Sequence, residues 1–425
     1  MPIFAKRPRT ASRLAIAAAL MSVGALGVTA FETPAYAQKR ANYSDDFVKA
    51  FAPVDEAMKA ENPDYEALLQ QARAVEATVK TDDDRFAYSS TLYNIAQKLE
   101  NTELQREAME MMIGSGKVPE EALPQYTYIA GQLAYNLKDY PAARERIEEA
   151  IALGYDVPDA EEFIASTYAQ EGDTAGGLQY VAAQVNDQVA AGETPAEKLL
   201  KRGLTIAYNN DMYEDATNFS LLLAKYYPSA TSWGDAIAIQ RNYGQYSDAE
   251  MLDLLRLLRA TNAMREARDY TDYIDAANFR RLPGEVGAVA QEGLSAGLLQ
   301  SGDVFVDEAV SESKQRVAGL RADLPELESD AKASGASASL AVAAGDVYLN
   351  FEQPAKAAEL YEVALTRPDV DRNTALTRLG IAQAKAGDYA AAQETFGQVQ
   401  GNRAPIAKLW ATYAEQQAGG GTAAS

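Results

Sequence analysis

Cysteine and histidine are both absent from this chain of 425 residues. Without cysteine there is no disulfide, no thiolate nucleophile and no lipid-carrying cysteine of the bacterial lipoprotein type. Without histidine there is no imidazole base, and the two absences together exclude a Cys/His zinc site. No alternating apolar pattern with turn signals predicts a sheet, and no long apolar run follows residue 30. These absences favour an all-α protein and exclude catalysis by cysteine or histidine.

Positive charge is scarce relative to negative charge. The chain has 61 acidic and 39 basic residues, with a formal net charge of -22. An acidic surface argues against nucleic acid and anionic lipid as partners, although solubility alone also accounts for it. The acidic run Asp82–Asp84 lacks the alternating ligand spacing and terminal glutamate of a calcium loop. We therefore expect it to cap a helix, and we expect no metal and no cofactor.

The amino terminus has the pattern of a secretory signal peptide over residues 1–37. Basic residues, including Arg9 and Arg13, precede an apolar run from Leu14 to Ala30. The small residues around Tyr36 predict cleavage after Ala37. The run is short and rich in alanine and glycine, which disfavours the alternative of an uncleaved membrane anchor. We expect a bacterial periplasmic protein without stable membrane insertion after cleavage.

The segment from Pro124 to Pro158 is typical of two short helices joined by a tight turn. Gly131 in the first half lets two helices approach closely. Asp139 is placed to cap the second helix, and Pro141 is tolerated in its first turn. The apolar residues of the second half lie three and four apart on one face, at Ala143, Ile147, Ala150 and Ile151.

Related patterns recur at intervals of 33 to 39 residues over most of residues 89–401. Small residues equivalent to Gly131 stand at Ala96, Ala165, Gly345 and Gly380. The recurrence resembles the tetratricopeptide repeat (TPR), a helix-turn-helix unit of about 34 residues. This resemblance implies an all-α, right-handed superhelical solenoid of TPR-like helical hairpins, of the kind found in exported bacterial TPR proteins.

The strength of the repeat pattern divides the mature chain. Residues 38–331 are predicted to form a repeat array, in which the hairpins of about 260–331 are degenerate. A Ser/Ala/Gly-rich segment at 332–339 is predicted to be a flexible joint. Residues 340–417 hold a carboxyl-terminal repeat pair and a closing helix, and residues 418–425 read as a disordered tail.

In the TPR family the first helix of each hairpin lines a concave groove, so its residues outside the core are candidates for binding a protein or peptide. The resemblance assigns this position to Tyr93, Gln97, Asn101, Tyr128, Gln132, Tyr135, Asn136, Lys201, Tyr208, Asn209, Arg241, Asn242 and Asn350. An asparagine amide both donates and accepts hydrogen bonds, which suits the backbone of an extended peptide. The recurring asparagines are equally typical of helix ends, and the tyrosines of core packing.

Two further sequence patterns resemble known functional sites. Lys198, Lys201 and Arg202 resemble the start of a TPR clamp for a terminal carboxylate, but Thr205 stands where that clamp has asparagine. The segment from Glu292 to Gln300 resembles part of a lytic transglycosylase motif, without the upstream catalytic pair. We therefore favour a periplasmic protein-interaction scaffold that is not an enzyme, serving envelope assembly, polysaccharide export or secretion. The alternative is a cell-wall-active enzyme that uses Glu292 as its acid.

Overall fold

The computed structural model describes residues 41–157 and 160–420, and these residues contain helices and no strand. The predicted signal peptide lies outside them. The chain divides into two compact units, one ending at Pro158 and one beginning at Asp159. This division falls inside the predicted array of residues 38–331 rather than at the predicted joint. Within the described residues, no helix is long and apolar enough to cross a membrane.

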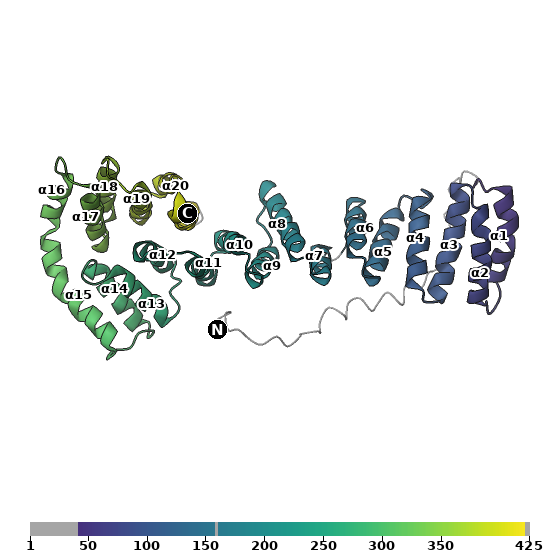
Figure 1. Cartoon of the computed structure of the whole chain (residues 1–425), viewed down its shortest axis with the longest axis horizontal. Coiled ribbons are helices and arrows are strands. Elements are labelled where there is room, and N and C mark those ends of the chain that lie inside the picture. The colour runs from purple at the N-terminus through teal and green to yellow at the C-terminus, as the bar shows by residue number, and fades with distance from the viewer. Residues whose placement is uncertain (1–40, 158–159, 421–425) are drawn as a thin grey trace. The chain divides into compact units, whose positions relative to one another are not determined.

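The first unit is a stack of antiparallel helices, each packed against the next (Figure 1). Its helices are α1 (Asp45–Met58), α2 (Tyr65–Val75), α3 (Asp82–Lys98), α4 (Thr102–Gly114), α5 (Leu123–Asn136) and α6 (Tyr140–Ala152).

The second unit begins with hairpins of the same kind and continues to the carboxyl-terminal helix. Its helices are α7 (Ala160–Glu171), α8 (Thr174–Ala190), α9 (Glu197–Asn209), α10 (Tyr213–Tyr226), α11 (Ala230–Tyr243), α12 (Asp248–Ala260), α13 (Ala267–Ala277), α14 (Pro283–Ser295), α15 (Val304–Ala322), α16 (Leu324–Lys332), α17 (Ala338–Asn350), α18 (Pro354–Leu365), α19 (Arg372–Ala386), α20 (Tyr389–Phe396) and α21 (Ala404–Gly420). The predicted all-α fold of consecutive hairpins is confirmed.

One turn geometry closes hairpins in both units. The residue before the cap of the second helix has positive φ, as at Lys138 (63°) and Gly387 (86°). The next residue, Asp139 or Asp388, caps that helix with its carboxylate, and its N–H returns to a carbonyl of the first helix. The predicted capping role of Asp139 is confirmed, as is the position of Pro141 in the first turn of α6.

Close packing inside these hairpins depends on glycine in the first helix. A Cβ atom at each of four glycines would lie 2.9 Å or less from a large side chain 16 residues further on. The pairs are Gly131 with Ile147, Gly203 with Phe219, Gly345 with Tyr361, and Gly380 with Phe396. The large side chain occupies the space that a β-carbon would need, so the small residues of the repeat pattern set the distance between helices.

The second unit is not a simple row of neighbours, because α21 returns to α10 and α12 (Figure 1). Trp410 Nε1 donates to the carbonyl oxygen of Asp253 at 2.9 Å, and Gln416 donates to the carbonyl oxygens of Ala224 and Lys225. One hydrophobic core extends from Leu221 to Ala414. The helices from α10 onward therefore form a closed body.

The boundaries of the carboxyl-terminal region differ from the predicted ones in detail. Residues 333–337 form a short loop between α16 and α17, where Arg367 donates to the carbonyl oxygen of Ala333 at 3.0 Å. The N–H of Ala338 donates to Asp369. The closing helix extends to Gly420, three residues past the predicted end at residue 417. Residues 421–425 of the predicted tail lie outside the described residues.

Candidate functional site

Two pairs of tyrosine and glutamine occupy equivalent places on the first helices of the first unit. Tyr93 and Gln97 lie on α3, and Tyr128 and Gln132 lie 35 residues further on α5. Gln132 donates to the Tyr128 hydroxyl at 2.8 Å, and Gln97 follows Tyr93 at the same spacing of four residues. Both tyrosines are half-buried, and burial raises the pKa of each. The result is a neutral, aromatic, hydrogen-bonding surface.

Neighbouring aromatic side chains extend this surface. Tyr93 packs beside Tyr126 against the small core of Met109 and Met112. The ring of Tyr128 stacks on Tyr155 with centroids 4.8 Å apart. The tyrosines therefore pack with part of each ring and leave the remainder exposed, which combines the two interpretations that the sequence left open.

The other predicted residues of the first unit have mixed roles. Tyr135 packs edge-on against Tyr140. Asn136 is exposed at the end of α5, as the groove hypothesis requires. Asn101 instead caps α4, because its side chain accepts from the N–H of Leu104 at 3.0 Å. Asn101 therefore lies after the end of α3 and begins the next helix.

The second helices of the first unit carry charge that is already paired. Arg73 on α2 makes a bidentate pair with Glu107 on α4, both contacts at 2.6 Å. Arg146 on α6 makes a bidentate pair with Glu110 on α4. These bidentate pairs join successive hairpins and occupy hydrogen-bond donors of both guanidinium groups. The Tyr–Gln pairs of the first helices, by contrast, are uncharged.

In the second unit, the predicted residues do not form one binding row. Lys201 is exposed and pairs with Glu197 on the same helix at 2.7 Å. Tyr208 lies near Tyr243, and Asn209 and Asn242 are exposed. The Arg241 side chain is 14% exposed and pairs with Asp269 and Asp272, so it ties α11 to α13.

Asn350 is a correction to the predicted groove. It is 4% exposed, and its side-chain oxygen accepts from the N–H of Glu285 at 2.8 Å. The repeat pattern placed it on an open helix face, but α14 covers that face in the closed body. Asn350 is therefore a buried contact between two hairpins.

Sequence reasoning missed a buried ionic network at the centre of the closed body. Arg256 donates to both oxygens of Glu285 at 2.8 Å and also to Asp253 at 3.1 Å. Arg403, from the segment before α21, donates to the other oxygen of Asp253 at 2.6 Å. The available signal was a pair of opposite charges three residues apart on a helix with leucines on every side, in LDLLRLL.

The electrostatics of Glu285 show how the network is balanced. Burial alone would raise its pKa, but Arg256 and the Tyr273 hydroxyl lower the pKa to about 2, from an ordinary value of 4.5. The ionised carboxylate therefore stabilises the fold above pH 4.5. That stabilisation is lost as the pH falls through about 2.

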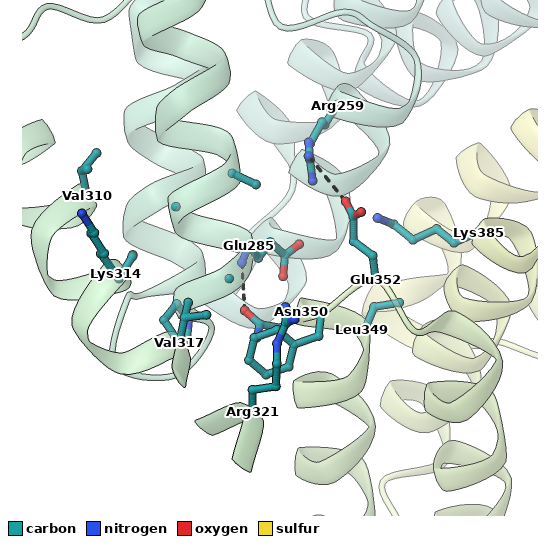
Figure 2. Close-up of a pocket in the computed structure, with 16 residues that line it drawn as sticks. Arg259, Glu285, Val310, Lys314, Val317, Arg321, Leu349, Asn350, Glu352 and Lys385 are labelled. Atoms are coloured by element: carbon teal, nitrogen blue, oxygen red, sulfur yellow. Dashed lines mark hydrogen bonds and ion pairs between the residues drawn. The ribbon is translucent and has the colours of Figure 1, made fainter. Parts of the chain in front are cut away.

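A cavity of about 440 Å³ lies beside this network (Figure 2). It opens between α14, α15, the end of α17, and single residues of α12 and α19. Its volume falls in the range of about 300 to 1,000 Å³ that is usual for small-molecule sites. Charged side chains from four helices and from the turn after α17 reach its wall, namely Arg259, Glu285, Lys314, Arg321, Glu352 and Lys385.

No protein-family model and no curated protein matches the chain. One similar solved structure is that of Naa15/Naa10 bound to HypK-THB, with 13% sequence identity and a TM-score of 0.25. The match covers 88% of this chain and 73% of that chain.

Glu292, the candidate acid of the enzyme alternative, is held by an arginine. Arg259 donates to both of its carboxylate oxygens, at 2.9 and 2.5 Å. A general acid must present a protonated oxygen to its substrate, whereas this carboxylate already accepts a bidentate guanidinium.

The acidic run at Asp82–Asp84 caps a helix, as predicted. Asp84 and Thr81 form a capping box at the start of α3, and Asp83 pairs with Lys117. Across residues 41–157 and 160–420, no group of three or more acidic side chains is arranged to hold a metal ion.

Proposed function

We propose that the protein is a periplasmic protein-interaction scaffold of the TPR type, and that its first unit binds an extended segment of a partner protein. The observation that carries the proposal is the repeated Tyr–Gln pair on α3 and α5. Exposed tyrosine edges supply apolar contact, and amides and hydroxyls satisfy a peptide backbone. The proposal involves no chemical step by this chain.

The location rests on the amino-terminal sequence pattern of residues 1–37. The setting would be envelope assembly, polysaccharide export or secretion. Cell fractionation followed by amino-terminal sequencing tests the location, because the mature chain should start at Gln38 and be found in the periplasm. A cytoplasmic chain that keeps Met1 would contradict it.

The binding surface is tested with the purified mature protein. Partners captured from periplasmic extract are identified by mass spectrometry, and one is then purified and titrated against wild-type protein and variants. Tyr93→Ala and Tyr128→Ala should each weaken binding about tenfold or more, since interface tyrosines are frequent energetic anchors.

The matched controls are Glu145→Ala and Glu148→Ala, at exposed positions of α6. They should leave binding unchanged. If all four variants bind alike, the first-helix surface of α3 and α5 is not the docking site. Clearing of cell-wall material by the wild-type protein, abolished by Glu292→Gln, would support the enzyme alternative instead.

A further inference from the structure

Polar atoms without partners stand at the wall of the cavity in the closed body. Ser313 is 1% exposed and Asn350 is 4% exposed, and both line the cavity. Neither the Ser313 hydroxyl nor the Asn350 side-chain nitrogen has a hydrogen-bond partner. A buried donor without a partner destabilises the fold, so each of these donors is available to a ligand. Both can donate a hydrogen bond to an oxygen atom.

The charges around the same cavity are unbalanced toward positive. Among the lining cations, Arg259 is neutralised by Glu292, and among the acids Glu285 is neutralised by Arg256. Lys314, Arg321 and Lys385 have no carboxylate within salt-bridge distance in the described parts of the chain. Glu352 is the remaining acid of the wall, and its nearest cation, Arg259, is 4.0 Å away. Lys314, Arg321 and Lys385 therefore outnumber this one remaining acid in a chain whose net charge is -22, and all four residues are exposed.

The positions of the cations suit a ligand held between two walls. Figure 2 shows Lys385 approaching from α19 on the side of Arg259 and Glu352, and Arg321 on the side of Asn350. The Arg321 guanidinium lies over the Phe351 ring, 4.8 Å from its centroid, which orients it at the wall. Val310, Val317 and Leu349 supply apolar surface between the charged groups.

Lys385 is exposed and lies near charges of both signs. The protein around it lowers its pKa, Arg256 and Arg259 lower the pKa further, and Glu285 and Glu352 act in the opposite direction. A bound anion would offset the repulsion from the two arginines.

We propose that this cavity binds a small organic oxyanion, a carboxylate or phosphate monoester with an apolar portion. Arg321 and Lys385 contribute the charge, and Ser313 and Asn350 donate hydrogen bonds. The site is separate from the surface of α3 and α5 and does not depend on the proposed partner binding. It would make the closed body a ligand-responsive part of the scaffold, because the ligand contacts residues of three of its helices, α15, α17 and α19.

The test is calorimetric titration of the mature protein with citrate, glycerol 3-phosphate and inorganic phosphate, each at matched ionic strength in sodium chloride. Binding of an organic probe is expected, and the preferred probe distinguishes carboxylate from phosphate. Arg321→Gln and Lys385→Gln should each raise the Kd of the bound probe about tenfold, which corresponds to roughly 1.4 kcal/mol of binding free energy. Ser313→Ala should weaken it about threefold, with the fold retained because only a hydroxyl is lost.

Arg268→Gln is the matched control, since its side chain is 79% exposed on α13 of the same unit. It removes one positive charge away from the cavity and should leave affinity unchanged. Equal weakening by Arg268→Gln would show a general charge effect and overturn the site. If none of the three probes binds saturably at concentrations up to about 10 mM, the proposed oxyanion site is overturned as well. Tyr93→Ala should not change oxyanion binding, so failure here and failure of the partner surface are distinguishable.

Discussion

At the residue scale, the fold depends most on glycines that face large side chains. Leucine at Gly131 would meet Ile147, and leucine at Gly380 would meet Phe396, within each hairpin. We expect each substitution to lower the free energy of unfolding by about 1 to 3 kcal/mol or more through overpacking. Urea unfolding of the variants measures this cost.

Gly319→Leu is the control for these variants. Gly319 is exposed on α15, and a β-carbon there meets no atom within 4 Å. Leucine should be neutral or stabilise the helix by up to about 1 kcal/mol, since glycine is a poor helix former. Equal destabilisation at all three glycines would show that their effect is not one of close packing.

The recurring asparagines should separate into two classes. Asn101→Ala removes the cap of α4 and should cost about 1 kcal/mol. Asn136→Ala alters an exposed amide and should change stability by no more than about 0.5 kcal/mol. Thermal unfolding of the two variants decides between the roles. A cost at Asn136 equal to that at Asn101 would make both of them helix-end residues and would remove Asn136 from the binding surface.

At the element scale, one carboxylate joins the starts of two helices in the first unit. Asp84 is buried at the start of α3, and it accepts from the N–H and hydroxyl of Ser44 before α1. It also accepts from the N–H groups of Lys80 and Thr81 at 3.0 Å. Burial opposes ionisation, but these hydrogen bonds outweigh burial and lower the pKa of Asp84 below 3.8.

Asp84→Asn should therefore destabilise the first unit by about 1 to 3 kcal/mol at neutral pH. The ionised form stabilises the fold above the unfolded pKa of 3.8, and this stabilisation is lost as the pH falls through the lower folded pKa. Denaturant unfolding at several pH values should show the difference between wild type and variant shrinking below pH 3.8. Asp55→Asn, at an exposed position, is the control. If the stability difference between wild type and Asp84→Asn stays constant with pH, the ionised form of Asp84 is not what stabilises the fold.

At the scale of the whole molecule, Asp253 holds the closed body together. Its side chain accepts from Arg256 and Arg403, and its carbonyl accepts from Trp410. Asp253→Asn removes the buried charge that balances two arginines and should cost about 3 to 5 kcal/mol. Trypsin should then cleave after Arg403 faster than in wild-type protein.

Asp248→Asn, at an exposed position of the same helix, is the control for Asp253. It should leave the rate of cleavage and the unfolding midpoint unchanged. If Asp253→Asn also leaves the rate of cleavage after Arg403 unchanged, the return of α21 does not depend on this ionic contact.

Closure also changes which region should open first. The fading repeat pattern of residues 260–337 predicts early opening in a row of neighbouring repeats. The structure instead buries Tyr273, Val286 and Val289 of that region in the core shared by α10 to α21. We expect amide hydrogens of α13 and α14 to exchange as slowly as those of α12, and those of α15, with three buried residues, to exchange faster. Fast exchange throughout α13 and α14 would instead support the prediction that residues 260–337 open first.

The sequence by itself determined the local architecture. Helical periodicity, capping aspartates and small residues at intervals near 34 predicted the hairpins, because turns and intrahairpin packing are set by residues close together in the chain. The same local rules placed Tyr93, Gln97, Tyr128 and Gln132 on one kind of surface. These features needed no knowledge of distant contacts.

Tertiary contacts determine which helix faces remain exposed. Asn350 follows the same local pattern as Asn136, yet Asn350 is buried because α14 covers it, whereas no described residue of the first unit covers Asn136. The return of α21 to α12 joins residues about 150 positions apart, and no repeat period predicts that contact. Buried charges such as Asp253 and Arg256 are stable only when oppositely charged residues from distant parts of the chain pack against them. The ionic network and the cavity beside it therefore form only when the second unit closes.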